Sequence, residues 1–534
     1  MNFRTLISMS CIALLCAATP VAAQTDAYKT DADKIAALVA QLEERIDSLE
    51  RSNEELTARL EQMDAAGSIA QPAAAPTLAG QATSNPHVIN SDNMDMVAAR
   101  PQVSAQMSDA DQKRGFTDTI GIAPEYSYRV LDHAEDTNTK PLLQLTAITD
   151  GLLDNRVTVS GSTIAIATAQ RSNRPSKFGY LMRNPTSANQ IGSTVTEAVL
   201  HDAKIAVTAR VTQDVTAYAE LLYDPQQSFG AGTITALTRN QIQLRRGWVM
   251  LGNLEKSPVY ALIGKMDTPF GLNDTVSPFT NSTTWHAFAG LAYGAQAGFV
   301  KDGLHVRAMA IQGGAQFRSA NTPVNGTNVP SKLNNFAVDA RYELALGGQG
   351  NTIMAGASYQ HGSPYCQSYP VFHFNPCADN VPAWVAYGRL KYGDLQVIGE
   401  FARTTKVWPG SAVPIPTNPL SIFEAQKTEA FTAGARYAFG PENSTKQGRN
   451  FALSGEFSKF IAGEKGAPWE RQNQAVLGLS WFPADNLNLF AEYVHVDGFA
   501  PLNFLSGGNF PDGSTWSERD AKTDVALIGA QVSF

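Results

Sequence analysis

The chain has 534 residues, of which 43% are hydrophobic and 17% are charged, and it carries a formal net charge of -8 with a sequence pI near 5.6. This acidic balance argues against nucleic acid as a partner. The sequence also lacks the long apolar runs of an inner-membrane protein. If the protein spans a membrane, we therefore expect it to do so with strands.

Residues 1–23 have the pattern of a secretory signal peptide. Arg4 supplies the positive charge, residues 6–18 form the apolar core, and small residues at 21–23 offer a cleavage site. The apolar run is too short for a membrane-spanning helix. We expect an exported protein in which residues 24–32 form a short N-terminal lead.

Residues 33–64 carry an unbroken heptad repeat with a narrow apolar seam and charged flanks. This pattern predicts a coiled coil, which we place in the periplasm. Arg45, Ile46, Leu49 and Glu50 resemble the short trimer-specifying motif of coiled coils, in which an arginine reaches a glutamate across the interface. We therefore expect a homotrimer.

Residues 65–115 are rich in Ala, Pro, Ser, Gly and Gln and are predicted to form a disordered linker or a wall-crossing spacer.

Residues 116–534 alternate apolar and polar side chains between turn signals. Short connections, such as 301–303 and 392–394, alternate with long ones, such as 361–382 and 404–427. This asymmetry is typical of an outer-membrane barrel with its short turns in the periplasm. Counting back from Phe534, an aromatic residue that ends an apolar strand, we predict an all-β fold. It is a transmembrane antiparallel β-barrel of about 16 strands, a size that encloses an aqueous channel.

The positions of the four cysteines are consistent with an exported protein. Cys11 and Cys16 fall within the signal segment, so the exported chain keeps Cys366 and Cys377. A pair of cysteines close in sequence in an exported protein predicts a disulfide within one loop, and two free thiols are the alternative.

Period-two parity predicts which charged side chains face the lumen. Descending strands bring arginine inward and ascending strands bring glutamate, so we expect a belt of alternating sign. In it, Arg389 with Glu400 and Arg436 with Glu456 are diagonal neighbours across a hairpin. The belt either braces the inner wall or acts as a transverse field that orients a permeating zwitterion or polar solute. The predicted pore-lining residues are Glu220, Arg245, Lys265, Arg307, Asp339, Arg341, Glu343, Arg389, Lys391, Glu400, Arg436, Glu456 and Glu492.

No catalytic, cofactor or metal constellation stands out from the sequence. The histidines are scattered without metal-ligand spacing, and there is no nucleophile motif. Asp267 is better explained as a strand-end residue than as a catalytic acid. Residues 272–293, with Trp285, Phe288 and Tyr293, form the best candidate for a loop folded into the lumen, and an external loop that buttresses a trimer is the alternative.

The most distinctive run, from Arg245 to Gly271, closely resembles a hairpin of the LbtU-like siderophore porins. The order of signal peptide, coiled coil, linker and barrel is similar to that family too. The resemblance implies an outer-membrane channel for ferric siderophores or similar small polar solutes, but no ligand site. A TonB-type receptor is disfavoured, because such receptors need a folded plug and about twenty-two strands. The alternatives are a general or anion-type diffusion porin without a dedicated ligand, and an envelope tether whose N-terminal arm grips peptidoglycan.

Overall fold

The structure is a computed structural model. It describes residues 119–175, 177–183, 192–223, 242–312, 316–317, 320–321, 332–347, 350–365, 380–407, 424–443, 448–467, 470–500 and 518–534. The predicted signal peptide, N-terminal lead, coiled coil and linker lie outside the described residues, and so do Cys366 and Cys377. All described residues belong to one compact unit, the barrel.

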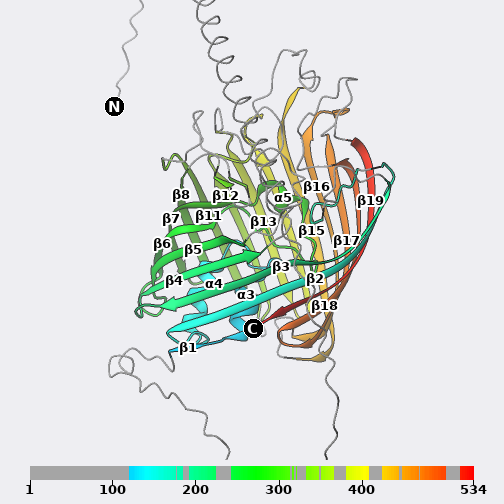
Figure 1. The fold of residues 1–534 in the computed structure, drawn as a ribbon. Coiled ribbons are helices and arrows are strands. Elements are labelled where there is room, and N and C mark those ends of the chain that lie inside the picture. The colour runs from blue at the N-terminus through cyan, green and yellow to red at the C-terminus, as the bar shows by residue number, and fades with distance from the viewer. Residues whose placement is uncertain are drawn as a thin grey trace, which may run out of the picture. The chain divides into compact units, whose positions relative to one another are not determined.

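Sixteen strands form a closed antiparallel ring (Figure 1). They are β2 (Val157–Ser172), β3 (Thr194–Arg210), β4 (Val215–Tyr223), β5 (Ile242–Gly252), β6 (Val259–Asp267), β7 (Leu291–Lys301), β8 (Leu304–Ile311), β11 (Asn335–Ala345), β12 (Thr352–Gln360), β13 (Ala383–Tyr392), β14 (Leu395–Thr404), β15 (Ala425–Glu442), β16 (Arg449–Gly463), β17 (Arg471–Ala484), β18 (Leu487–Ala500) and β19 (Glu518–Ser533). The predicted fold class and strand number are confirmed.

Further short elements are not among the sixteen strands of the ring. They are β1 (Ile120–Gly121), α3 (Pro124–Val130), α4 (Lys140–Thr149), α5 (Thr283–Phe288) and the two-stranded pair β9 (Gln316–Phe317) and β10 (Ala320–Asn321). β1 pairs in parallel with the start of β2. Among the described residues, no helix is both long and apolar enough to cross a membrane.

The ring closes where the last strand meets the first. β19 pairs antiparallel with β2 over the registers from Thr523 with Ser172 to Ser533 with Ser162. Beyond β19, the main chains of Phe534 and Gly161 exchange two hydrogen bonds of 2.9 Å each. On the other side of the ring, β8 pairs antiparallel with β11. Each of the sixteen described strands of the ring therefore has a neighbour on both sides, and none of them has an unpaired edge.

Tight turns mark the end of the barrel at which the C-terminus lies (Figure 1). β7 and β8 are joined by Asp302 and Gly303, which have φ of 50° and 81°. Positive φ at both central residues matches the strand twist of a two-residue hairpin, and it is the reason why glycine occupies the second position. We call this end the short-turn end and the opposite end the long-loop end.

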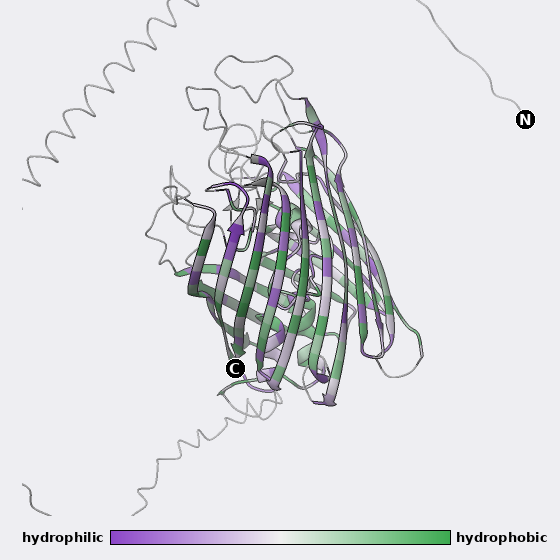
Figure 2. Ribbon diagram, turned by 90° about the vertical axis from the view of Figure 1, so that its right-hand side faces the viewer, coloured by the Kyte–Doolittle hydropathy of each residue, from purple (hydrophilic) through white to green (hydrophobic). Residues whose placement is uncertain are grey.

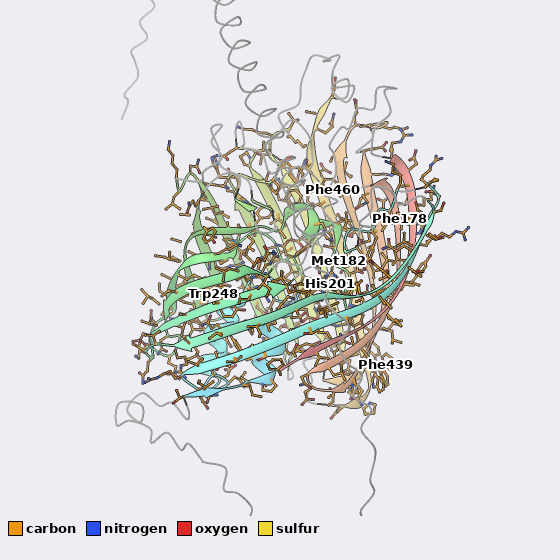
Figure 3. All side chains as sticks on the ribbon, viewed as in Figure 1. Phe178, Met182, His201, Trp248, Phe439 and Phe460 are labelled. Carbon is orange, nitrogen blue, oxygen red and sulfur yellow. The ribbon has the colours of Figure 1, made fainter. Side chains whose placement is uncertain are left out.

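The outer surface of the ring is apolar along most strands, and hydropathy alternates along each strand (Figure 2). On β17, Leu477 is 62% exposed whereas its neighbour Val476, facing inward, is 2% exposed. Near the short-turn end, outward rings of Phe439, Phe451 and Trp481 stack with centroids 5.6 and 6.4 Å apart. An apolar band with aromatic residues at its edge is the outer surface that a lipid bilayer requires of a barrel. Figure 3 places Phe439 toward the short-turn end and Phe460 toward the long-loop end.

The lumen is occupied, which corrects the expectation of an open aqueous channel. Helices α3 and α4 lie inside the ring toward the short-turn end, and α5 lies inside it farther up (Figure 1). Tyr126, Leu143 and Leu145 from the two N-terminal helices are buried in one apolar cluster with Trp248 and Tyr260 of the wall. Side chains from within the same chain therefore fill the described part of the lumen, and the first part of the predicted barrel segment forms two helices inside the ring.

Candidate functional site

Two segments occupy the lumen. We call residues 123–153, which include α3 and α4, the plug segment, and residues 268–290, which include α5, the inward loop. The sequence left the position of the inward loop open between the lumen and the exterior, and the structure places it in the lumen, where Phe288 is buried. Tyr293 is not part of it, because this residue lies on β7 and is 43% exposed.

Polar contacts fix the plug segment to the wall. Tyr126 Oη lies 2.9 Å from Thr208 Oγ1, and Ser127 Oγ donates to Ser160 Oγ at 2.8 Å. Trp248 Nε1 donates to Gln144 at 3.0 Å. Each of these buried polar groups therefore has a partner, which offsets the cost of removing it from water.

Lys140 closes the plug segment on itself. Its ammonium donates to the main-chain oxygens of Val130 at 2.6 Å and Asp132 at 2.8 Å, and these oxygens lie at the C-terminal end of α3. Carbonyls at this end of a helix have no partner within the helix, so a cation satisfies them well. Burial of the side chain lowers the pKa of Lys140 to about 8.

Two glutamates of the wall hold the first part of the inward loop. Glu400 of β14 accepts from the main-chain N–H groups of Leu272 at 2.9 Å and Asn273 at 3.2 Å. Glu456 of β16 accepts from the N–H of Val276 at 3.0 Å and from the hydroxyl of Thr275 at 2.7 Å. These two carboxyl groups therefore satisfy main-chain and hydroxyl donors of the inward loop that burial removes from water.

A third glutamate holds the next turn of the inward loop. Glu492 of β18 accepts from the N–H groups of Phe279 at 2.7 Å and Thr280 at 3.0 Å. The three glutamates lie on alternate strands, β14, β16 and β18, so the inward loop follows the circumference of the wall. Threonine contacts add to this, because Thr284 of α5 lies 2.7 Å from Thr432 of β15, oxygen to oxygen.

Arginines of the wall hold the plug segment instead. Arg436 forms an ion pair with Glu135, and both side chains are about nine-tenths buried. Arg389 lies 3.7 Å from Asp136 of the plug segment and 3.7 Å from Asp274 of the inward loop. Arg389 is thus the point at which both segments meet the wall. Burial, together with the nearby charge of Asp136, raises the pKa of Asp274 to about 7.

The most deeply buried ion pair of the described wall also reaches the plug segment. Arg307 lies 2.6 Å from Asp339, and their side chains are 1% and 0% exposed. Arg307 also donates to the main-chain oxygen of Asn138. Asp339 accepts further bonds from Ser358 at 2.7 Å and Tyr387 at 2.6 Å. A buried pair with its remaining polar atoms satisfied is the arrangement in which removing one partner costs most.

These contacts correct the predicted pairing within the belt. The sequence predicts Arg389 with Glu400 and Arg436 with Glu456, but each arginine bonds to acidic groups of other segments and each glutamate bonds to the inward loop. Parity identifies the face of a strand, but it carries no information about segments that enter the lumen from elsewhere in the chain.

Lys265 lies on the outer side of β6, because it pairs with the outward-facing Tyr293 of β7 and shares a face with Ile263, which is 70% exposed. Lys265 donates to the main-chain oxygen of Leu244 at 2.8 Å. Arg341 and Glu343 of β11 and Lys391 of β13 share the inner face of their strands with buried neighbours, and they are partly exposed. The structure therefore places twelve of the thirteen predicted side chains on the inner face, with Lys265 as the exception, and brings most of the twelve against the plug segment, the inward loop or a wall partner.

Sequence reasoning missed Arg246. A β-bulge opposite Glu220 and Leu221 turns both Arg245 and Arg246 inward, where both are buried. Arg246 lies 2.9 Å from Glu220 and 2.6 Å from Asp267, so Asp267 is an ion-pair partner at the end of β6. Strict alternation cannot place two consecutive residues on the same face, so only the adjacent arginines themselves hinted at the bulge.

The plug residues Glu135 and Asp136 were missed for another reason. Pro124 and Pro141 stand in the first turns of α3 and α4, and proline there is a helix-start signal that the sequence offered. The acidic residues lie between these two signals, on the connection between the helices.

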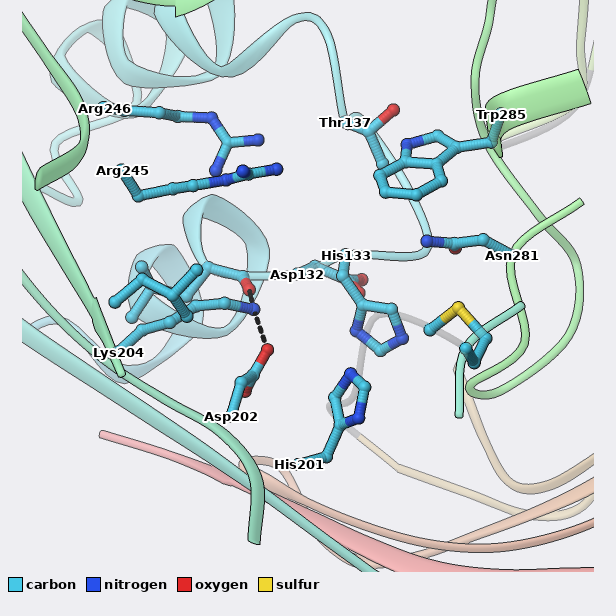
Figure 4. A pocket seen from close by; sticks show the side chains of 13 residues that line it. Asp132, His133, Thr137, His201, Asp202, Lys204, Arg245, Arg246, Asn281 and Trp285 are labelled. Atoms are coloured by element: carbon cyan, nitrogen blue, oxygen red, sulfur yellow. Dashed lines mark hydrogen bonds and ion pairs between the residues drawn. The ribbon is translucent and has the colours of Figure 1, made fainter. Parts of the chain in front are cut away.

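A cavity of about 80 Å³ remains between the plug segment, the inward loop and β3 to β5 (Figure 4). On this scale it has room for several water molecules. Asp202 and Lys204 of β3 form an ion pair of 2.8 Å at its side. Among the described residues, no group of three or more His, Cys, Asp or Glu side chains is placed to hold a metal ion.

The described residues thus define a closed sixteen-stranded barrel whose lumen is filled by two segments of its own chain. No family model matches the sequence. No curated protein matches it either.

Solved structures of porins and channels are similar to this chain over nearly their whole length. An anion-selective porin from Comamonas acidovorans is 10% identical, with a TM-score of 0.43 over 71% of this chain and 99% of its own. The outer membrane channel DcaP of Acinetobacter baumannii is 13% identical, with a TM-score of 0.41 over 71% and 97%. OprB of Pseudomonas putida is 9% identical, with a TM-score of 0.43 over 75% and 99%. These similarities concern the barrel fold alone. The resemblance to LbtU-like siderophore porins stays a prediction.

Proposed function

We propose that this protein is a porin-like channel of the bacterial outer membrane, that it admits small polar solutes, and that the plug segment and the inward loop close it at rest. The observation that carries the proposal is a sixteen-stranded wall with an apolar exterior and a charged inner face. A ring of this size is wide enough for an aqueous path.

The contacts of the two lumen segments support closure rather than permanent filling. Main-chain amides on carboxylates, as at Glu400 and Glu492, can exchange for water when a segment moves. The cavity of about 80 Å³ is too small to pass a solute of ordinary size. An always-open diffusion porin is disfavoured for the same reason.

Ferric siderophores are the solutes implied by the resemblance of residues 245–271. Such a solute would require both segments to move, because the resting cavity is too small for it. Purified protein in liposomes, assayed by swelling with sugars and dicarboxylates and by uptake of radiolabelled ferric siderophore, tests the proposal. Flux of any polar solute above that of protein-free liposomes supports a channel, and siderophore uptake adds the finer specificity. Absence of flux for every solute would remove the channel.

We also propose a homotrimer, with the coiled coil of residues 33–64 below the membrane in the periplasm. The outer face of β2 near the closure carries Ala165, Ala167, Ala169 and Arg171, and Asp524 lies outward beside them on β19. Charged side chains are poorly suited to lipid, and small ones allow another barrel to approach closely. Native mass spectrometry tests this assembly, and a monomer at every detergent concentration would contradict it.

A further inference from the structure

Four buried polar atoms around the cavity lack a hydrogen-bond partner among the described residues. They are Nδ1 of His133, Nδ1 of His201, Oδ1 of Asp202 and Oδ1 of Asn281. His201, Asp202 and Asn281 are each at least nine-tenths buried. Unpaired buried polar atoms cost free energy, so a cluster of them around one cavity points to an occupant that supplies the missing partners.

The chemistry of these atoms calls mainly for hydrogen-bond donors. Nε2 of His133 lies 2.9 Å from the main-chain oxygen of Phe279, and a carbonyl only accepts, so Nε2 carries the proton. Burial lowers the pKa of His133, which keeps the ring neutral and leaves Nδ1 as an acceptor. The free oxygens of Asp202 and Asn281 are acceptors as well.

The opposite side of the cavity is lined by two arginines, of which Arg246 also pairs with Glu220 and Asp267. Arg245 and Arg246 reach in from β5, and His133, Asn281 and Trp285 lie across from them (Figure 4). Guanidinium groups match the geometry of a carboxylate. The indole ring of Trp285, which also lines the cavity, offers its face to a cation. The two sides therefore favour opposite charges on one small ligand.

We infer that the cavity binds a small zwitterion that carries a carboxylate and a protonated amine on the same carbon atom, such as a free amino acid with a short side chain. Its carboxylate faces Arg245 and Arg246, and its amine faces His133 Nδ1 and Asn281 Oδ1 beside the ring of Trp285. The cavity of about 80 Å³ limits the ligand to a few heavy atoms. The inference rests on the proposed function, because the zwitterion is a solute held in the closed channel.

Isothermal titration of the purified full-length protein in detergent tests this inference with L-serine as the probe. L-glycerate replaces the amine with a hydroxyl, and 2-aminoethanol lacks the carboxylate. We expect one serine per chain, with both analogues bound at least about tenfold more weakly, as loss of a bond to a charged group requires. No heat from serine at millimolar concentration, or equal binding of either analogue, overturns the inference.

Two substitutions of Asn281 separate binding from a structural effect. Asn281→Leu removes the acceptor and is expected to weaken serine binding about tenfold, whereas Asn281→Asp adds a negative charge facing the amine and is expected to strengthen it. Asn488→Leu is the matched control, because Asn488 is a buried inner-face asparagine of β18 that does not line this cavity. It should leave serine binding unchanged. Equal weakening by both Asn281 variants overturns the inference.

The proposed binding site and the proposed channel can be refuted independently of each other. Heat-modifiable migration on a gel shows that each variant has kept a folded barrel. If the protein binds serine but passes no solute, the zwitterion site is supported and the proposed channel is refuted. If the protein passes solutes without binding serine, only the proposed zwitterion site is refuted.

Discussion

Glu492 of β18 accepts a hydrogen bond of 3.0 Å from the main-chain N–H of Thr280, and it is the last of three glutamates that hold the inward loop along the wall. With Glu400 and Glu456, it binds successive turns of the inward loop from alternate strands. The inward loop is therefore attached mainly through its main chain. Its attachment depends on the carboxyl groups of the wall more than on the identity of its own side chains.

Glu492→Gln should loosen the inward loop. The amide keeps only one of the two acceptor oxygens and turns an N–H₂ group toward donors of the inward loop, at a cost of about 1 kcal/mol. We expect single-channel recordings in planar bilayers to show several-fold more frequent openings. Glu442→Gln is the control, because that side chain is 83% exposed and pairs with Arg449 away from the inward loop. Equal opening frequencies in Glu492→Gln and the parent would contradict this role.

Arg389→Met should change ion selectivity. It removes the cation that Asp136, Asp274 and Glu343 share, at distances of 3.7, 3.7 and 3.3 Å. Three carboxylates would then face the lumen without it, so we expect the reversal potential in a KCl gradient to shift toward cations. Arg403→Met is the control, because Arg403 pairs with Glu429 on the outer face. An unshifted potential in Arg389→Met would speak against conduction past this point.

Opening should depend on pH through Asp274. Its pKa rises from 3.8 to about 7 in the closed lumen, because the side chain is buried near Asp136. A raised carboxyl pKa means that the closed state binds the proton more tightly, so its advantage is complete below about pH 4 and is lost as the pH rises toward 7. We expect open probability to rise from about pH 5 to 7 and to level off above that. Asp274→Asn should flatten this rise, and an unchanged profile in that variant would exclude Asp274 as the cause.

Lys140→Met should destabilise the plug segment. The substitution leaves the carbonyl oxygens of Val130 and Asp132 without their donor, at a cost of roughly 1–3 kcal/mol. Limited proteolysis should cut the plug segment faster while the barrel stays intact. Lys256→Met, at an exposed ion pair with Asp214, should change little, because such pairs contribute about 0–1 kcal/mol. Equal proteolysis of the two variants would contradict the capping role.

The wall could be predicted from the sequence because each strand shows its own alternation of apolar and polar residues, which can be read without knowing its neighbours. Alternation along β17 places Val476 inward and Leu477 outward, and the structure agrees. The same rule, counted from Phe534, led to sixteen strands and to a first wall strand near Val157. The bulge beside Arg246 broke the alternation, because one inserted residue shifts the face of its neighbour.

The contents of the lumen could not be predicted in this way. Glu400 and Leu272 lie 128 residues apart, and no periodic pattern links them. α3 and α4 have seven and ten residues, too short for a clear helical period. Their folding depends on the apolar cluster that they form with wall residues such as Trp248, which exists only once the ring has closed.

A disulfide between the plug segment and the wall tests the central claim most directly. Ser127 Oγ and Ser160 Oγ lie 2.8 Å apart, so Ser127→Cys with Ser160→Cys, in a background with Cys366→Ser and Cys377→Ser, should link α3 to β2. The measurement is the rate of liposome swelling in a small sugar, before and after reduction. If the plug segment must move for the channel to open, the oxidised protein should show little flux and reduction should restore the rate of the parent. Equal flux in the oxidised and reduced protein, with the disulfide verified by mass spectrometry, would contradict the account.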